Sequence, residues 1–128
     1  MDPVFKNKRI LFVEDDEANR FYMRLLLEEI GCSFDVASNG QEAVDKTKVN
    51  KYNVIFMDLK MPVLDGFEAT KRIRDGIDKN VLIVAVSANV LDDVVEKCLS
   101  VGMNGFIAKG ADIEEFKKEI LSWLSKSL

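Results

Sequence analysis

Five short apolar segments alternate with five longer segments of mixed polarity, and this alternation restricts the fold more than any other feature of the chain. Strands are predicted at 9–13, 34–37, 54–57, 81–86 and 105–108. Helices are predicted at about 18–30, from a cap at 38–40 to about 49, at about 67–74 and 90–101, and from 112 to about 125. The five β–α units predict an α/β fold: a doubly wound, five-stranded parallel sheet of order 2-1-3-4-5 with five helices on both faces.

The length and composition indicate one soluble globular domain. The chain has 128 residues, with no effector-like segment after the last predicted helix. No apolar run approaches the roughly 20 residues that span a bilayer, and the N-terminus lacks the apolar stretch of a signal peptide. We therefore expect a single cytoplasmic domain over 1–128, without a membrane span or an effector domain. The net charge of -4 disfavours nucleic acid as a partner.

The chain contains no histidine, and its two cysteines, Cys32 and Cys98, are far apart in the sequence. The absence of histidine excludes a Ser-His-Asp triad, histidine-ligated zinc and phosphohistidine chemistry within the chain. A phosphohistidine donor must therefore be another molecule. With no export signal, the cysteines are expected to be reduced thiols that fill space rather than a disulfide or a metal site.

Acidic residues follow two of the predicted strands. Asp58 ends the apolar run 54–57, and Glu14-Asp15-Asp16-Glu17 follows the first strand. In a sheet of order 2-1-3-4-5, the carboxyl ends of strands 1 and 3 border the ligand crevice, so Asp15, Asp16 and Asp58 are expected there. Two like charges about 4 Å apart repel by roughly 4 kcal/mol at an effective dielectric constant near 20. A bound Mg²⁺ or Mn²⁺ would offset that repulsion, because both ions prefer oxygen ligands.

Two further polar residues, Ser87 and Lys109, follow the fourth and fifth strands. Asp58 is the candidate nucleophile for a phosphoryl group, with Lys109 neutralising one phosphoryl oxygen and Ser87 donating a hydrogen bond to another. Each residue alone has an ordinary alternative role. Asp15 or Asp16 would cap the first helix, Lys109 would be a solvated surface lysine, and Ser87 would be a turn hydroxyl. Their joint position at four strand ends favours the functional interpretation.

This set of residues resembles the receiver domain of two-component response regulators. The resemblance covers the chain from about Lys8 onward. It implies the flavodoxin-like fold of the chemotaxis receivers. The order and spacing of the matching segments are specific to this family. The segments that carry it are Val13-Glu14-Asp15-Asp16, Met57-Asp58-Leu59-Lys60-Met61-Pro62-Val63-Leu64-Asp65-Gly66, Ser87-Ala88-Asn89 and Phe106-Ile107-Ala108-Lys109.

The resemblance implies a phosphoacceptor and a metal site. Asp58 is implied to accept the phosphoryl group from a phosphohistidine. Asp16 and Asp58 are implied to bind Mg²⁺ directly, together with the main-chain oxygen of Lys60. Asp15 is implied to bind the ion through a water. Such a domain is not an enzyme beyond its own phosphorylation and dephosphorylation.

The resemblance also implies a conformational switch and protein partners. Ser87 and Lys109 would contact the phosphoryl group, and Phe106 occupies the aromatic switch position. A phosphoryl group that attracts Ser87 would leave space for Phe106 to turn inward and bias a two-state equilibrium. The ordinary alternative for Phe106 is a core aromatic. The implied partners are a sensor histidine kinase or a histidine phosphotransfer protein, and a downstream protein target or onward transfer. The implied state is a monomer or a weak phosphorylation-dependent dimer.

The chain departs from the family pattern after Lys109, where the family usually has a proline in a cis peptide. Here Gly110 follows, so we expect trans geometry or a flexible loop. If Lys109 were misplaced as a result, the domain would be a pseudo-receiver that is not phosphorylated and acts as an interaction module. In addition, Lys60 lies two residues after the phosphoacceptor, where a side chain influences the attacking water.

The first predicted helix suggests a docking surface. Its buried face is expected from the family pattern to contain Tyr22, Met23, Leu26, Leu27 and Ile30. Ala18, Phe21 and Leu25 lie on another face and form an apolar strip beside the acidic site. This strip could receive a helix of a histidine phosphotransfer protein. The alternative is that these are scattered exposed apolar residues without a function.

Three other classes of protein fit the sequence less well. A flavodoxin-type FMN carrier needs a donor-rich phosphate loop after the first strand, whereas this loop is acidic. A haloacid-dehalogenase-like phosphatase needs a second Asp two residues after the nucleophile, where Lys60 stands. A nucleotide hydrolase needs a Gly-rich loop ending in Lys-Ser or Lys-Thr, and the sequence has none.

Overall fold

Five parallel strands form the centre of the molecule in a computed structural model, which describes residues 5, 7–88, 91–109 and 112–127. The strands are β1 (Arg9–Val13), β2 (Ser33–Ala37), β3 (Val54–Asp58), β4 (Leu82–Ser87) and β5 (Gly105–Ala108). The helices are α1 (Glu17–Ile30), α2 (Gly40–Val49), α3 (Gly66–Arg74), α4 (Asp92–Ser100) and α5 (Ile113–Lys126). Each predicted strand and helix is present, with boundaries that differ by a residue or two.

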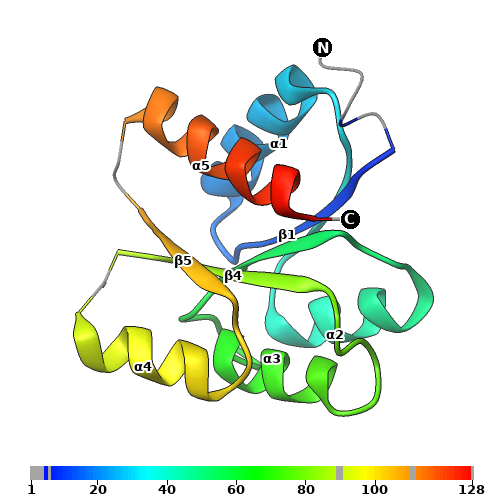
Figure 1. Cartoon of the computed structure of the whole chain (residues 1–128), viewed down its shortest axis with the longest axis vertical. Helices are drawn as coiled ribbons and strands as arrows, with labels where there is room; N and C mark the ends of the chain where they lie inside the picture. Colours follow the sequence, from blue (N-terminus) through cyan, green and yellow to red (C-terminus); the bar gives the residue numbers. More distant parts are fainter. Residues whose placement is uncertain (1–4, 6, 89–90, 110–111, 128) are drawn as a thin grey trace.

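The strand order is β2-β1-β3-β4-β5, and all neighbouring strands are parallel. The predicted doubly wound fold is therefore confirmed. Helices α1 and α5 cover one face of the sheet, and α2, α3 and α4 cover the other (Figure 1). The central strands β1, β3 and β4 are apolar apart from a polar residue at one end of each, because both of their faces are covered.

Each face of the sheet has its own core. Phe12, Phe56 and Ile120 belong to the core beneath α1 and α5. Met57 and Ile73 belong to the core beneath α2, α3 and α4. Both cysteines, Cys32 and Cys98, are buried and free, as the sequence predicts.

Four helices begin at a side chain that accepts a hydrogen bond from a backbone N–H three residues later. The capping residues are Asp16 for α1, Asn39 for α2, Asp65 for α3 and Asp112 for α5. Such caps satisfy N–H groups that have no partner within the helix. They fix where each helix starts, and therefore where the preceding loop lies.

The register of the sheet aligns the strand ends that carry polar residues. Val13 pairs with Met57, so the residue after β1 is level with Asp58. Asp58 in turn pairs with Val86, and Ser87 pairs with Ala108. The carboxyl ends of β1, β3, β4 and β5 thus meet at one edge. Within the described part of the chain, no helix has both the length and the apolar character needed to cross a membrane.

Candidate functional site

The predicted polar residues at the four strand ends line one cleft of about 300 Å³ at the carboxyl edge of the sheet. The side chains and backbone that border it come from the β1–α1 loop, the end of β3, the end of β4 and the residue after β5. They are Glu14, Asp15, Asp16, Asn19, Asp58, Lys60, Ser87, Ala88 and Lys109. The structure therefore brings the predicted residues together, although the contacts that some of them make differ from those predicted.

Lys109 forms the central contact of the cleft. Its Nζ lies 2.9 Å from Oε1 of Glu14 and 3.2 Å from Oδ2 of Asp58. Both carboxylates are buried, with Glu14 2% and Asp58 7% exposed. The backbone also positions Lys109, because its N–H donates to the carbonyl oxygen of Ser87 at 2.8 Å. An ammonium group placed between two buried carboxylates is a specific arrangement and not a solvated surface lysine.

Glu14 is a site residue that the sequence analysis did not identify. One carboxylate oxygen, Oε2, accepts from the backbone N–H of Asp16 at 3.2 Å. The other, Oε1, accepts from the side-chain amide of Asn19 at 3.3 Å. These contacts hold the buried carboxylate against Lys109. Its position directly after the last buried residue of β1 is the sequence signal for its burial, because the register places it beside Asp58.

The acidic loop after β1 is held by a basic residue of α1. The Arg20 guanidinium donates through Nη1 to the carbonyl oxygens of Glu14 at 2.9 Å and Asp15 at 2.7 Å. Carboxylate oxygens of Glu14, Asp15 and Asp58 lie within 4.8 Å of one another. This is the group of side chains in the described residues that is arranged to hold a metal ion.

Asp16 lies outside that group, in contrast to the predicted metal site. Its Oδ2 accepts from the backbone N–H of Asn19 at 2.9 Å and caps α1. The capping alternative considered for the acidic run is therefore confirmed for Asp16. Asp16 lines the same cleft as Asp58, but the carboxylates that converge with Asp58 within 4.8 Å are those of Glu14 and Asp15.

Burial and charge shift the pKa values of the three central groups. Burial, together with the neighbouring Glu14 carboxylate, raises the pKa of Asp58 from 3.8 to about 6 against the opposing effect of Lys109. For Glu14, burial acts to raise the pKa, but the hydrogen bonds with Lys109, Asp58 and the Asp16 N–H outweigh it and lower the pKa. Burial likewise disfavours the Lys109 ammonium, but the two carboxylates raise its pKa. Lys109 and Glu14 are thus a charged pair, and Asp58 is the carboxylate that the protein stabilises least.

The packing of α3 against the end of β3 fixes the backbone of Asp58. A Cβ atom at Gly66, the first residue of α3, would lie 2.2 Å from the carbonyl oxygen of Asp58. The Gly66 N–H donates to the carbonyl oxygen of Leu59 at 3.0 Å. The Asp-Gly pair of the sequence is therefore required for close packing, with Asp65 capping the helix and Gly66 leaving room for the strand.

The remaining predicted residues lie near the cleft. Ser87 is half-buried at its edge, and Lys60 is exposed and lines it. Phe106, on the neighbouring strand β5, is 41% exposed. Gly110, where the family pattern breaks, lies outside the described residues. No peptide bond among those described is cis.

The outer face of α1 carries the predicted apolar strip. Phe21 is 64% exposed, Leu25 is 52% exposed, and Ala18 beside them is exposed as well. The prediction that Tyr22 is buried was wrong, because its side chain is 43% exposed. Tyr22 borders a second cavity between α1 and α5 instead of joining the core. The other four residues of the expected buried face are buried.

Comparisons with known proteins show which sequences and folds this chain is similar to. A family model described as the response regulator receiver domain matches residues 10–121. Hybrid signal transduction histidine kinase B of Dictyostelium discoideum is 44% identical over 116 residues, which is 81% of this chain. The chain spans only 6% of the length of that kinase.

Two solved structures are similar over almost the whole chain. The receiver domain of the Pseudomonas aeruginosa sensor histidine kinase PA1611, with a magnesium ion coordinated in its active-site cleft, is 33% identical with a TM-score of 0.83. That match covers 93% of this chain and 98% of the other. The receiver domain of Saccharomyces cerevisiae Ssk1, in complex with the histidine phosphotransfer protein Ypd1, is 33% identical with a TM-score of 0.86. It covers 97% of this chain and 94% of the other.

The raised pKa of Asp58 predicts that this residue lowers stability near neutral pH. Between its ordinary value of 3.8 and its folded value of about 6, the folded protein holds the proton more tightly than the unfolded chain does. The free energy of unfolding should therefore fall as the pH rises through this range. Asp58→Asn removes the charge and should be more stable than the wild type by on the order of 2 kcal/mol near pH 7.

Urea unfolding of both proteins across the range from pH 4 to pH 7 would measure this difference. The advantage of Asp58→Asn should shrink towards pH 4, where the wild-type carboxyl is protonated. Glu28→Gln removes an exposed carboxylate of α1 and is the control. Its free energy of unfolding should change with pH as that of the wild type does. Equal stability of Asp58→Asn and wild type at every pH would contradict the placement of an unfavourable charge at Asp58.

Proposed function

The chain belongs to the response regulator receiver domain family, and from this premise we propose that Asp58 accepts a phosphoryl group from a phosphohistidine on a partner protein. Receiver domains are signalling modules. The further proposal is that this domain catalyses only its own phosphorylation and dephosphorylation. Its two free buried cysteines favour a reducing compartment, and we place the reaction in the cytoplasm.

The arrangement of Asp58, Lys109 and Glu14 is the observation that carries this proposal. Asp58 is the buried carboxylate whose negative charge the surrounding residues stabilise least, and it faces a cleft that opens to solvent. Lys109 is already within 3.2 Å of one of its oxygens, in reach of an incoming phosphoryl group. A pseudo-receiver would not require this arrangement, and the described residues therefore favour a phosphorylated domain.

The acidic group fits a hard divalent cation. Glu14, Asp15 and Asp58 supply only oxygen ligands, and their carboxylates converge within 4.8 Å. We assign Mg²⁺ to Asp15 and Asp58, with Glu14 beside them and the Lys60 main-chain oxygen as predicted from the family. When bound, the ion would polarise the phosphoryl group and neutralise charge in the cleft. The magnesium ion in the PA1611 receiver supports the same chemistry.

The transfer itself is a displacement at phosphorus. An oxygen of Asp58 forms the new O–P bond while the N–P bond of the donor phosphohistidine breaks. The electron pair of the broken bond stays on the imidazole nitrogen, which leaves with the donor. Lys109 neutralises a phosphoryl oxygen during this step, and the Ser87 hydroxyl donates to another. Hydrolysis of the resulting acyl phosphate by water would return Asp58 to its starting state.

The signal would leave through β4 and β5. A phosphoryl group adds charge and acceptor oxygens, which attract the Ser87 hydroxyl. Phe106 lies on β5, the strand paired with β4, and its exposure leaves it free to turn inward when Ser87 moves. This switch biases two states that already exist. An alternative output is onward transfer of the phosphoryl group to a histidine phosphotransfer protein.

The exposed strip on α1 is the proposed docking surface for the phosphodonor. Phe21 and Leu25 lie on the first helix after the acidic loop, so a helix packed on them would reach the cleft. The complex of the Ssk1 receiver with Ypd1 supports a partner of this kind. Similar regions within hybrid kinases support the same conclusion.

Phosphorylation predicts a mass change that depends on Asp58. After incubation with acetyl phosphate and Mg²⁺, the intact mass should rise by one phosphoryl group. The adduct should be absent in Asp58→Asn and in the presence of a chelator, because both remove a required part of the site. In Lys109→Met the rate should fall about 10²-fold or more, because one electrostatic contact to the phosphoryl group is lost. A wild-type protein that binds Mg²⁺ but gives no adduct from any donor would support the pseudo-receiver instead.

Docking predicts an effect that depends on the donor. Leu25→Ser should slow transfer from phosphorylated Ypd1 about tenfold, as expected when one apolar contact of an interface is removed. The rate with acetyl phosphate should not change, because that donor needs no docking surface. Val49→Ser, at an exposed apolar residue of α2, is the matched control and should behave as the wild type does. Equal slowing with both donors would indicate damage to the cleft and contradict the docking role.

The metal assignment distinguishes Asp15 from Asp16. Asp15→Asn should weaken Mg²⁺ binding at least about tenfold in a calorimetric titration, because a carboxylate ligand is lost. Asp16→Asn removes the same charge but preserves the helix cap, since Asn caps as well as Asp does. Its Mg²⁺ affinity should stay within about twofold of the wild type. A large loss in Asp16→Asn alone would restore the assignment drawn from the family pattern.

A further inference from the structure

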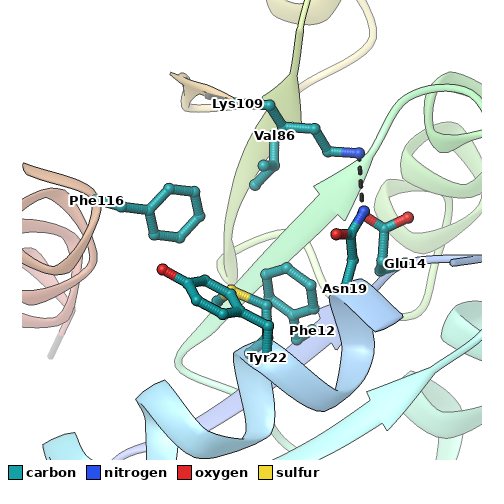
Figure 2. A pocket seen from close by; sticks show the side chains of 8 residues that line it. Phe12, Glu14, Asn19, Tyr22, Val86, Lys109 and Phe116 are labelled. Carbon is teal, nitrogen blue, oxygen red and sulfur yellow. Dashed lines mark hydrogen bonds and ion pairs between the residues drawn. The ribbon is translucent and has the colours of Figure 1, made fainter. Parts of the chain in front are cut away.

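A second cavity, of about 420 Å³, lies beside the acidic cleft, between α1, α5 and the carboxyl end of the sheet. Figure 2 shows the rings of Phe116, Tyr22 and Phe12 around the open space, with Lys109 and Glu14 at its other end. Ligand cavities in proteins are typically about 300–1,000 Å³, mainly apolar, with a few convergent polar groups. This cavity has both properties.

The cavity and the acidic cleft share a wall. Glu14, Asn19 and Lys109 line both of them. Within the wall, Lys109 Nζ lies 2.9 Å from Glu14 Oε1, and the Asn19 amide donates to the same oxygen at 3.3 Å. A molecule in the cavity would therefore touch the groups whose other side faces Asp58. Binding in the cavity would therefore change the affinity of the acidic cleft for its ligands through these shared residues.

The lining residues define the chemistry of the ligand. Three aromatic rings, with Met23 and Val86, suit a flat ring system. Glu14 lies in the shared wall and Asp58 lies behind it, and both carboxylates contact the single ammonium of Lys109. Two negative charges against one positive charge leave a surplus of negative charge. An anionic group would be repelled there, whereas a cationic hydrogen-bond donor would be attracted. The Asn19 amide nitrogen already donates to Glu14, which leaves the amide oxygen as an acceptor.

We propose that this cavity binds small planar aromatic cations, and that occupancy weakens Mg²⁺ binding in the acidic cleft. The binding site itself depends only on the cavity and its charges. The effect on Mg²⁺ rests on the function proposed above. The positive charge of the ligand would compete for the same surplus of negative charge that the metal neutralises.

Benzamidine is a suitable probe, because it combines a flat ring with an amidinium group. Titrated into the full chain and followed by amide chemical shifts, it should bind with a Kd on the order of 1 mM, as expected for so small a ligand. Tyr22→Ala removes an exposed wall of the cavity without opening the core and should weaken binding at least about fivefold. Phe21→Ala, the adjacent exposed aromatic that does not line the cavity, should bind as the wild type does. Benzoate, of the same shape but opposite charge, should bind at least about tenfold more weakly.

Several results would overturn the proposal. If Tyr22→Ala bound benzamidine as tightly as the wild type does, the cavity would not be the binding site. If benzoate bound as tightly as benzamidine, the proposed preference for cations would be wrong. Binding that survives in Tyr22→Ala and is displaced by Mg²⁺ would place the cation in the acidic cleft instead.

A second arm tests the coupling. Saturating benzamidine should raise the Kd for Mg²⁺ at least about twofold in the wild type, with a smaller effect in Tyr22→Ala. An unchanged Kd would overturn the coupling while leaving the binding site. The failure of the proposed function is a separate result, because it would appear as a missing acetyl phosphate adduct with benzamidine binding intact.

Discussion

The Lys109 ammonium, held between two buried carboxylates, is the interaction on which the chemistry of this domain depends. It lies closer to Glu14 than to Asp58, and the pKa values of the two acids move in opposite directions. Lys109 and Glu14 form a charged pair, whereas Asp58 is left with a charge that its surroundings disfavour. Asp15 brings a third carboxylate within 4.8 Å of these two, so the group holds three carboxylates and one ammonium. The unfavourable charge of Asp58 is expected to lower the stability of the domain, and the surplus of negative charge is what a divalent cation would neutralise.

The sequence was sufficient to predict the fold and the location of the site, because both follow from where apolar runs end. The run that ends at Asp58 and the one that ends at Val13 identify two adjacent strand ends, and the β–α alternation determines their order. The assignment within the acidic run was different. Among four consecutive acids, the one directly after the apolar run is the candidate to be level with Asp58, but whether it is depends on the register of β1 against β3 and on where α1 begins. The structure puts Glu14 there, and Asp16 becomes the helix cap.

Tyr22 shows a second limit of prediction from the sequence. It adjoins the buried stripe of α1, and the family pattern places it in the core. Its side chain is instead partly exposed at the gap between α1 and α5, where it faces the same cavity as Phe116. The separation of α1 and α5 at that end of the sheet is a property of helix packing, which a single sequence does not specify. The aromatic cavity follows from that separation, and so it appears only in the structure.

The two cavities and the ion pair form one electrostatic unit. An acyl phosphate at Asp58 would carry more negative charge than the free carboxylate and would draw Lys109 away from Glu14. Glu14 would then depend on the Asp16 N–H and the Asn19 amide, which already contact both of its oxygens. Because Glu14 and Asn19 also line the aromatic cavity, the loss of the Lys109 contact would make that cavity more negative. By linkage, a cation in the cavity and a phosphoryl group on Asp58 would then favour each other, although the same cation opposes Mg²⁺. Mg²⁺ in the cleft would thus lower the affinity of the cavity for a cation, whereas a phosphoryl group on Asp58 would raise it.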